Sequence, residues 1–145
     1  MHKLFLAGLI ALIPAVPALS QGERMPGQHF LENWDADGDG AVSLEEVRAK
    51  RSDVFFMFDQ NEDGALDSGE YDLFDSTRKE DMAANAGGQG GGMGRAQKGF
   101  LRDFNDRDGD GRVTEEEFVD ASDAFLELVD RDGDDRLTTS DFGRK

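Results

Sequence analysis

Hydrophobic residues recur at helical spacing ahead of four polar, Asp-rich segments of the chain. Spacings of three and four residues place such side chains on one face of a helix. Ahead of three of the segments the sets are Phe30, Leu31 and Trp34; Val54, Phe55 and Phe58; and Phe125, Leu126 and Val129. Ahead of the third segment the set is shifted by one residue, to Phe100, Leu101 and Phe104, with Asn105 next to the segment. The pattern predicts an all-α fold in which a short helix leads into each polar segment.

The polar segments lie close together in pairs. Only residues 47–58 separate the first two segments, and only residues 118–129 separate the last two. We therefore expect one shared helix in each pair, over 44–58 and over 115–129, each about 22 Å long. A straight shared helix holds its two segments at opposite ends. Contact between segments then requires either a sharp kink near 50–53 or pairing with a segment from the other half of the chain.

The four segments are twelve-residue repeats: DADGDGAVSLEE over 35–46, DQNEDGALDSGE over 59–70, DRDGDGRVTEEE over 106–117 and DRDGDDRLTTSD over 130–141. Their pattern resembles the calcium loop of the EF-hand family, and their compact spacing resembles that of small secreted bacterial EF-hand proteins. The resemblance implies oxygen ligands at loop positions 1, 3, 5, 9 and 12, a carbonyl ligand at position 7 and glycine at position 6. Calcium suits such a loop because it is a hard cation that takes six to eight oxygens.

The resemblance assigns each loop a set of candidate calcium ligands, in which the position-7 residue acts through its backbone carbonyl. In loop 1 they are Asp35, Asp37, Asp39, Ala41, Ser43 and Glu46. In loop 2 they are Asp59, Asn61, Asp63, Ala65, Asp67 and Glu70. In loop 3 they are Asp106, Asp108, Asp110, Arg112, Thr114 and Glu117. In loop 4 they are Asp130, Asp132, Asp134, Arg136, Thr138 and Asp141.

Loop 4 departs from the pattern at two positions. Asp135 stands in place of the position-6 glycine, and Asp141 at position 12 is one methylene shorter than glutamate. Loop 4 is therefore expected to bind calcium most weakly, or to accept magnesium. In all four loops position 8, a core position in this family, is apolar: Val42, Leu66, Val113 and Leu137. Plain solvated turns would not repeat these apolar flanks at two equal spacings.

The net charge narrows the possible functions. The chain has 32 acidic and 16 basic residues, which gives a formal net charge of −16. Such a chain repels nucleic acids and anionic membrane surfaces, so we expect neither as a partner. Cysteine is absent, which excludes disulfides and thiolate metal sites. Each of the four loops holds four carboxylates at ligand positions. Without cations these would repel one another strongly, so we expect calcium binding to be coupled to folding.

The remaining sequence predicts the domain organisation. Residues 4–16 carry no charge, are too short to span a bilayer and precede small residues, which is typical of a signal peptide over 1–20. Cleavage after Ala18 or Ser20 would give a secreted or periplasmic protein with no membrane contact; an uncut membrane anchor is the alternative. Residues 83–98 are rich in glycine and predict a flexible linker between two EF-hand pairs, over 21–82 and 99–145.

These features favour a calcium buffer or sensor without catalytic activity that binds about three to four calcium ions. The alternative is a calcium-dependent adaptor that binds a protein or polysaccharide partner at the cell surface. Phe56 is expected to face outward, but Met57 is the one methionine in a shared helix, which argues against a methionine-rich groove. An enzyme is disfavoured because the acids lie in the loops and His29 stands alone. The solvated face of the 44–58 helix is expected to carry Arg48, Lys50 and Arg51.

Overall fold

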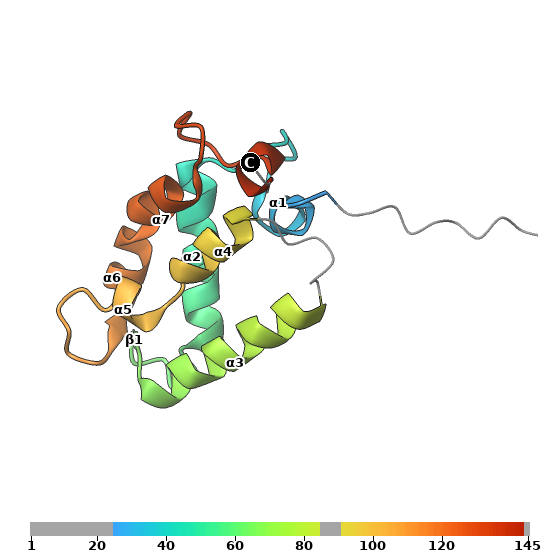
Figure 1. The fold of residues 1–145 in the computed structure, drawn as a ribbon. Helices are drawn as coiled ribbons and strands as arrows, with labels where there is room; N and C mark the ends of the chain where they lie inside the picture. The colour runs from blue at the N-terminus through green and yellow to red at the C-terminus, as the bar shows by residue number, and fades with distance from the viewer. Residues whose placement is uncertain (1–24, 85–90, 144–145) are drawn as a thin grey trace, which may run out of the picture.

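The computed structural model describes residues 25–84 and 91–143, which form the helical body in Figure 1. In chain order the elements are α1 (Gln28–Trp34), α2 (Leu44–Phe58), β1 (Ala65–Leu66), α3 (Ser68–Ala84), α4 (Gly91–Lys98), α5 (Arg102–Asn105), β2 (Val113–Thr114), α6 (Glu115–Asp120), α7 (Ser122–Val129) and α8 (Thr139–Phe142). The predicted all-α class is confirmed, because the only sheet in these two ranges consists of β1 and β2. The expected signal segment 1–20 lies outside the described residues. None of the described helices is long and apolar enough to cross a membrane.

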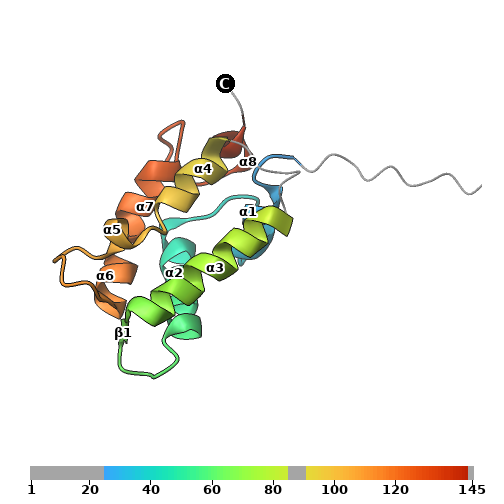
Figure 2. The same ribbon diagram turned by 60° about the horizontal axis from the view of Figure 1, so that its bottom comes forward.

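Helix α2 is the predicted shared helix between loops 1 and 2, and it spans residues 44–58 without interruption. It begins at a capping box, in which the Ser43 side chain accepts from the Glu46 amide and the Glu46 carboxylate accepts from the Ser43 amide. It packs against α6 and α7, and its buried residues are Val47, Arg51, Phe55 and Phe58. The helix therefore carries loop 1 at its start and loop 2 at its end (Figure 2).

The second shared helix differs from the prediction, because residues 115–129 form two helices, α6 and α7, which meet at Ala121. The Nε of Arg51 in α2 donates to the Phe118 carbonyl at 2.9 Å. In an unbroken helix this carbonyl would accept from the amide four residues later. A side chain that inserts into the hydrogen-bond ladder kinks a helix. The hydrogen bond from Arg51 thus lies one turn or less from the break at Ala121.

Loops from different halves of the chain lie side by side. Strand β1 of loop 2 pairs antiparallel with β2 of loop 3, with Leu66 opposite Val113. At the other end of α2, Val42 of loop 1 and Leu137 of loop 4 form a bridge with two backbone hydrogen bonds of 2.8 and 2.9 Å. Figures 1 and 2 show β1 and the C-terminal segment at opposite ends of the molecule. Of the two arrangements expected for contact between loops, the structure adopts pairing across the halves.

Part of the expected flexible linker is helical. The sequence predicts a flexible linker over 83–98, whereas the structure places 91–98 in α4, which packs against α7 and α8; residues 85–90 lie outside the described ranges. A Cβ at Gly92 would lie 2.5 Å from the Asp141 carbonyl oxygen, so only glycine allows this approach. Arg95 donates to the same carbonyl at 2.6 Å, and Ala96 is fully buried. The small residues thus serve close helix packing, which outweighs the low helix propensity of glycine.

The two halves of the chain share one hydrophobic core. Trp34 of α1 stacks on Phe125 of α7 with ring centroids 5.4 Å apart, and Phe74 of α3 lies 6.1 Å from Phe118 of α6. The position-8 residues are buried as predicted: Val42, Leu66, Val113 and Leu137. Phe56 is 58% exposed, which also matches the prediction. The boundaries 21–82 and 99–145 therefore divide the sequence but not the core.

Candidate calcium sites

In each loop, backbone amides donate hydrogen bonds to the carboxylate of the aspartate at position 1. In loop 1, Asp35 Oδ1 accepts from the Gly38 amide at 2.7 Å, and its Oδ2 accepts from the Gly40 amide at 2.9 Å. Both glycines have left-handed backbones, with φ of 75° and 90°. The bond from the position-6 amide recurs in the other loops, at Asp59, Asp106 and Asp130. The four loops therefore share one backbone turn, wound around the position-1 carboxylate.

The residue at position 12 closes each loop with both oxygens of its carboxylate. In loop 1, Glu46 Oε1 accepts from the Ala36 amide at 2.8 Å, and its Oε2 accepts from the Ser43 amide at 2.8 Å. Burial raises the pKa of Glu46, but hydrogen bonds from Ser43, Ala36 and Asp37 together lower it below its usual value. The same closure occurs at Glu70, Glu117 and Asp141. A carboxylate fixed across the loop in this way is suited to bind a divalent cation through two oxygens.

Positions 9 and 12 also cap the helix that follows the loop, a role that the ligand pattern does not predict. Reciprocal capping boxes join Ser43 to Glu46, Thr114 to Glu117 and Thr138 to Asp141. The signal in the sequence is Ser or Thr followed three residues later by an acid. In loop 2 the Asp67 carboxylate accepts from the Glu70 amide at 3.0 Å. Each loop and its exiting helix are therefore fixed by the same side chains.

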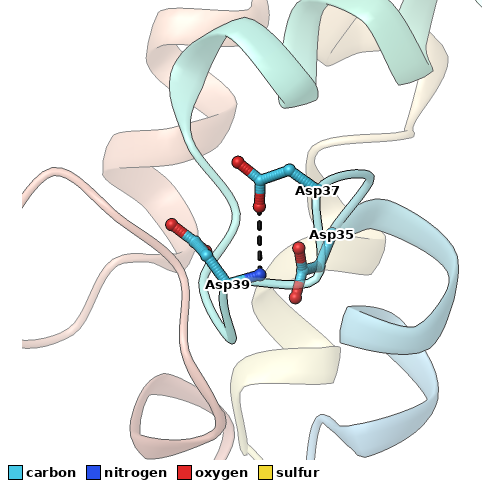
Figure 3. Close-up of side chains that lie close together, drawn as sticks. All are labelled: Asp35, Asp37 and Asp39. Atoms are coloured by element: carbon cyan, nitrogen blue, oxygen red, sulfur yellow. Dashed lines mark hydrogen bonds between the residues drawn. The ribbon is translucent and has the colours of Figure 1, made fainter.

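Three loops gather carboxylate oxygens closely enough to hold one cation. In loop 1 the oxygens of Asp35, Asp37 and Asp39 lie within 4.8 Å of one another, and Figure 3 shows the three side chains around the loop. Loops 3 and 4 have corresponding groups, formed by Asp106, Asp108 and Glu117 and by Asp130, Asp132 and Asp141. Among the described residues loop 2 forms no such acidic triad, and Asn61 stands at its position 3. Hard oxygen donors of this kind fit calcium.

The position-5 carboxylates complete the turn of each loop. Each accepts from the amide of the position-7 residue, at Asp39, Asp63, Asp110 and Asp134. The position-7 carbonyls, predicted as ligands at residues 41, 65, 112 and 136, belong to the same backbone turn. The structure thus brings the predicted residues of each loop together, and the ligand role of each one stays a prediction.

Loop 4 forms the same turn despite its two departures. Asp135 has a φ of 63°, the left-handed backbone that glycine takes in the other loops. Asp141 is 1% exposed, and its oxygens accept from the amides of Arg131 at 2.8 Å and Thr138 at 2.7 Å. The pKa of Asp132 is raised by loss of hydration and then by repulsion from Asp134, Asp141 and Asp130. The weak affinity expected for loop 4 therefore has two sources, the shorter carboxylate and a turn that an L-residue adopts at a cost.

Two arginine side chains join the paired loops. Arg112, at position 7 of loop 3, reaches Asp63 of loop 2 with an Nη2–Oδ2 distance of 2.7 Å. Arg136, at position 7 of loop 4, reaches Asp39 of loop 1 with an Nη2–Oδ2 distance of 2.5 Å. The hydrogen bond to Asp39 and the charge of Asp39 raise the pKa of Arg136. Sequence reasoning assigns only the backbone carbonyls of these arginines, because the side-chain contacts depend on which loops pair.

A buried polar cluster lies in the core, centred on Arg51 of α2. The expectation that Arg51 lies on the solvated face is wrong, because its side chain is fully buried. The guanidinium donates to the Phe118 carbonyl at 2.9 Å, to the Gly99 carbonyl at 3.3 Å and to the Asn105 side-chain oxygen. It also lies 4.3 Å from the centroid of the Phe118 ring, which is a cation–π distance. Burial lowers the pKa of Arg51 to about 10, so the group stays charged at neutral pH.

Asn105 explains the shift of the apolar residues ahead of loop 3. Its side chain is fully buried beside Arg51 and donates to the Tyr71 hydroxyl at 3.0 Å. Burial raises the pKa of Tyr71 to about 12. Asn105 directly precedes Asp106 of loop 3, and Tyr71 directly follows Glu70 of loop 2. The polar cluster therefore contacts the boundaries of both loops in this pair.

Comparison with known families supports the reading of the loops. A family model described as EF hand matches two segments of the chain, residues 29–49 and 103–120. These segments contain loops 1 and 3 with parts of their flanking helices. A comparison with curated proteins finds no match. The two matches and the acidic clusters support an EF-hand calcium-binding protein. EF-hand proteins typically bind calcium without catalysis.

Proposed function

We propose that the chain is a secreted or periplasmic calcium buffer or sensor that has no catalytic activity. The observation that carries the proposal is the convergence of carboxylate oxygens within 4.8 Å in loops 1, 3 and 4. In each loop the ion would be held by the side chains at positions 1, 3, 5, 9 and 12 and by the position-7 carbonyl. Bound calcium would neutralise the crowded carboxylates and so stabilise the turn of the loop.

The number of bound ions is proposed to be about three to four. Loops 1, 2 and 3 close with glutamate at position 12, which reaches the ion with two oxygens. Loop 2 also has four carboxylates at ligand positions, although Asn61 supplies the oxygen at position 3. Loop 4 closes with Asp141 and is the weak site, where magnesium is the alternative occupant. Magnesium suits it because it prefers shorter bonds and fewer ligands than calcium.

Counting bound ions by isothermal titration calorimetry tests this proposal. The chain from Gln21 onward is expected to bind three calcium ions clearly and a fourth weakly, on the EF-hand pattern. Glu46→Gln should remove about one ion, because a neutral amide cannot replace the bidentate carboxylate. Glu117→Gln should remove one ion in the same way.

The matched controls are the neighbouring acids Glu45 and Glu116, which are exposed and lie outside the ligand positions. Glu45→Gln and Glu116→Gln make the same change in charge and should leave the number of ions unchanged. Absence of stoichiometric calcium uptake at millimolar calcium would refute the proposal.

Export is proposed from the uncharged segment 4–16 and the small residues that follow it. In a host that exports the protein, mass spectrometry is expected to find a chain that starts at Leu19 or Gln21. The same chain made without export should keep its first residues. An exported chain that retains residues 1–20 would instead support the uncut membrane anchor.

A calcium-dependent adaptor is the second candidate, and one surface favours a protein partner. Phe56 and Met57 of α2 are 58% and 68% exposed. Met57 also lines a largely apolar cavity of about 330 Å³, which is bordered by residues of α1, α2, α3 and α4. An exposed Met side chain at the border of an apolar cavity, next in the chain to an exposed Phe, suits an apolar protein segment better than a polysaccharide.

A further inference from the structure

Each pair of loops contains one ion pair that reaches from one loop to a candidate calcium ligand of the other. Arg136 of loop 4 contacts Asp39 of loop 1, and Arg112 of loop 3 contacts Asp63 of loop 2. The arrangement is the same at both ends of the molecule, from position 7 of one loop to position 5 of its neighbour. The exposed fractions also match, at 45% and 48% for the arginines and 42% and 43% for the aspartates.

The contact runs in one direction within each pair. Position 7 is alanine in loops 1 and 2, at Ala41 and Ala65, so neither loop has a cationic side chain at this position to return the contact. Loops 3 and 4 therefore each contribute an arginine side chain, which contacts an aspartate of loop 2 and of loop 1 respectively. Two occurrences of one directed contact, in the loop pairs at the two ends of α2, are the observation that carries the inference.

The guanidinium takes the one carboxylate oxygen that the loop itself does not use. Asp39 Oδ1 accepts from the Ala41 amide at 3.0 Å, and Asp39 Oδ2 accepts from Arg136. Asp63 divides its oxygens in the same way, between the Ala65 amide at 3.0 Å and Arg112. A calcium ion held by either aspartate would therefore share its ligand with a fixed positive charge.

We propose that Arg136 and Arg112 set the calcium affinity of the opposite loops, lowering that of loop 1 and loop 2 respectively. The inference rests on the proposed calcium binding and adds its regulation. A cation and a divalent ion on one carboxylate repel each other, and the repulsion is reduced by water because the groups are half-exposed. Removing the arginine should therefore raise the affinity of the opposite loop about three- to tenfold.

Trp34 provides a signal for loop 1, because it directly precedes Asp35 and is 9% exposed. Calcium is titrated into the chelated chain from Gln21 onward while Trp34 fluorescence is recorded. For Arg136→Ala the midpoint is expected at about three- to tenfold lower calcium than in the wild type. Arg136→Gln keeps most of the side-chain length without the charge and should shift the midpoint in the same direction. In 1 M KCl the shift should shrink, because the Debye length falls to about 3 Å.

The matched control is Arg131→Ala, which removes the same charge from loop 4. Arg131 is exposed, and its Nη1 donates to the Gly143 carbonyl rather than to loop 1. This variant should shift the midpoint less than twofold, since distant exposed charges are screened. For loop 2, calorimetry of Arg112→Ala is compared with Arg107→Ala, an exposed arginine at position 2 of loop 3.

The outcomes separate this inference from the proposed function. A wild-type chain that takes up no calcium refutes the proposed function. A wild-type chain that binds calcium, with Arg136→Ala and Arg136→Gln no different from Arg131→Ala, overturns the inference alone. Weaker binding in both variants would also overturn it, because the arginine would then act to position Asp39 as a ligand. Circular dichroism of the calcium-loaded variants checks that each one is folded.

Discussion

Replacing Arg51 by alanine is expected to destabilise the protein by about 3–5 kcal/mol. The change leaves a cavity in the aromatic core and removes the donor from three buried acceptors. These are the Phe118 carbonyl, the Gly99 carbonyl and the side-chain oxygen of Asn105. Of the three, the Gly99 carbonyl keeps a hydrogen bond from the Asn105 side chain at 3.2 Å. A loss of this size is a large part of the 5–15 kcal/mol that stabilises a typical domain. Urea unfolding in saturating calcium, followed by circular dichroism, measures it.

Two further variants separate the causes of this loss. Arg51→Met fills most of the volume and removes only the donors, so it should cost about 1–3 kcal/mol. Arg48→Ala removes a charge from the same helix, but Arg48 is about half-exposed and pairs with Asp123 at the surface at 2.7 Å. Exposed ion pairs contribute about 0–1 kcal/mol. If Arg51→Ala costs no more than Arg48→Ala, the buried cluster does not stabilise the fold.

Removing calcium with a chelator is expected to lower both the helical content and the unfolding temperature. At a calcium concentration 100 times the dissociation constant, each site contributes about 2.7 kcal/mol to stability. Three such sites would contribute about 8 kcal/mol, which is comparable to the whole stability of a small domain. Removal also restores the repulsion among the four ligand carboxylates of each loop. Far-UV circular dichroism during a thermal scan measures both changes.

Magnesium at the same concentration is the control for general screening of charge. It should restore less of the unfolding temperature than calcium, because three of the four loops close with a glutamate that suits the larger ion. Identical spectra and unfolding temperatures with calcium and with chelator would contradict the coupling of binding to folding.

Local patterns in the sequence were sufficient to predict α2 and the loop turns, but not α4 or the break between α6 and α7. The short distance between loops 1 and 2 predicts α2 over the residues that it occupies, and position 8 predicts four buried side chains. These predictions succeed because helical periodicity and loop winding depend on residues close together in the chain. The pairing of loops across the halves depends on contacts between distant segments. The sequence alone therefore did not decide between this pairing and a sharp kink near residues 50–53.

The burial of Arg51 was predicted wrongly from its residue type, although its position in the helix indicates burial. It lies four residues after Val47 and four before Phe55, on the apolar face of α2. Its charge suggested a solvated position, whereas its spacing matches the core. The linker is a similar case, because the glycines over 91–98 suggested flexibility. Gly92 instead allows α4 to approach α8, which composition alone does not reveal.

Pairing across the halves has a consequence for how the molecule can be divided. Loop 1 borders loop 4 and loop 2 borders loop 3, so neither half of the chain contains two neighbouring loops. A fragment that ended near residue 84 would carry two solitary loops at the ends of one helix. Its bridging residues Val42 and Leu66 would be uncovered and open to self-association. The smallest unit in which every loop is paired with another loop therefore extends from α1 to α8.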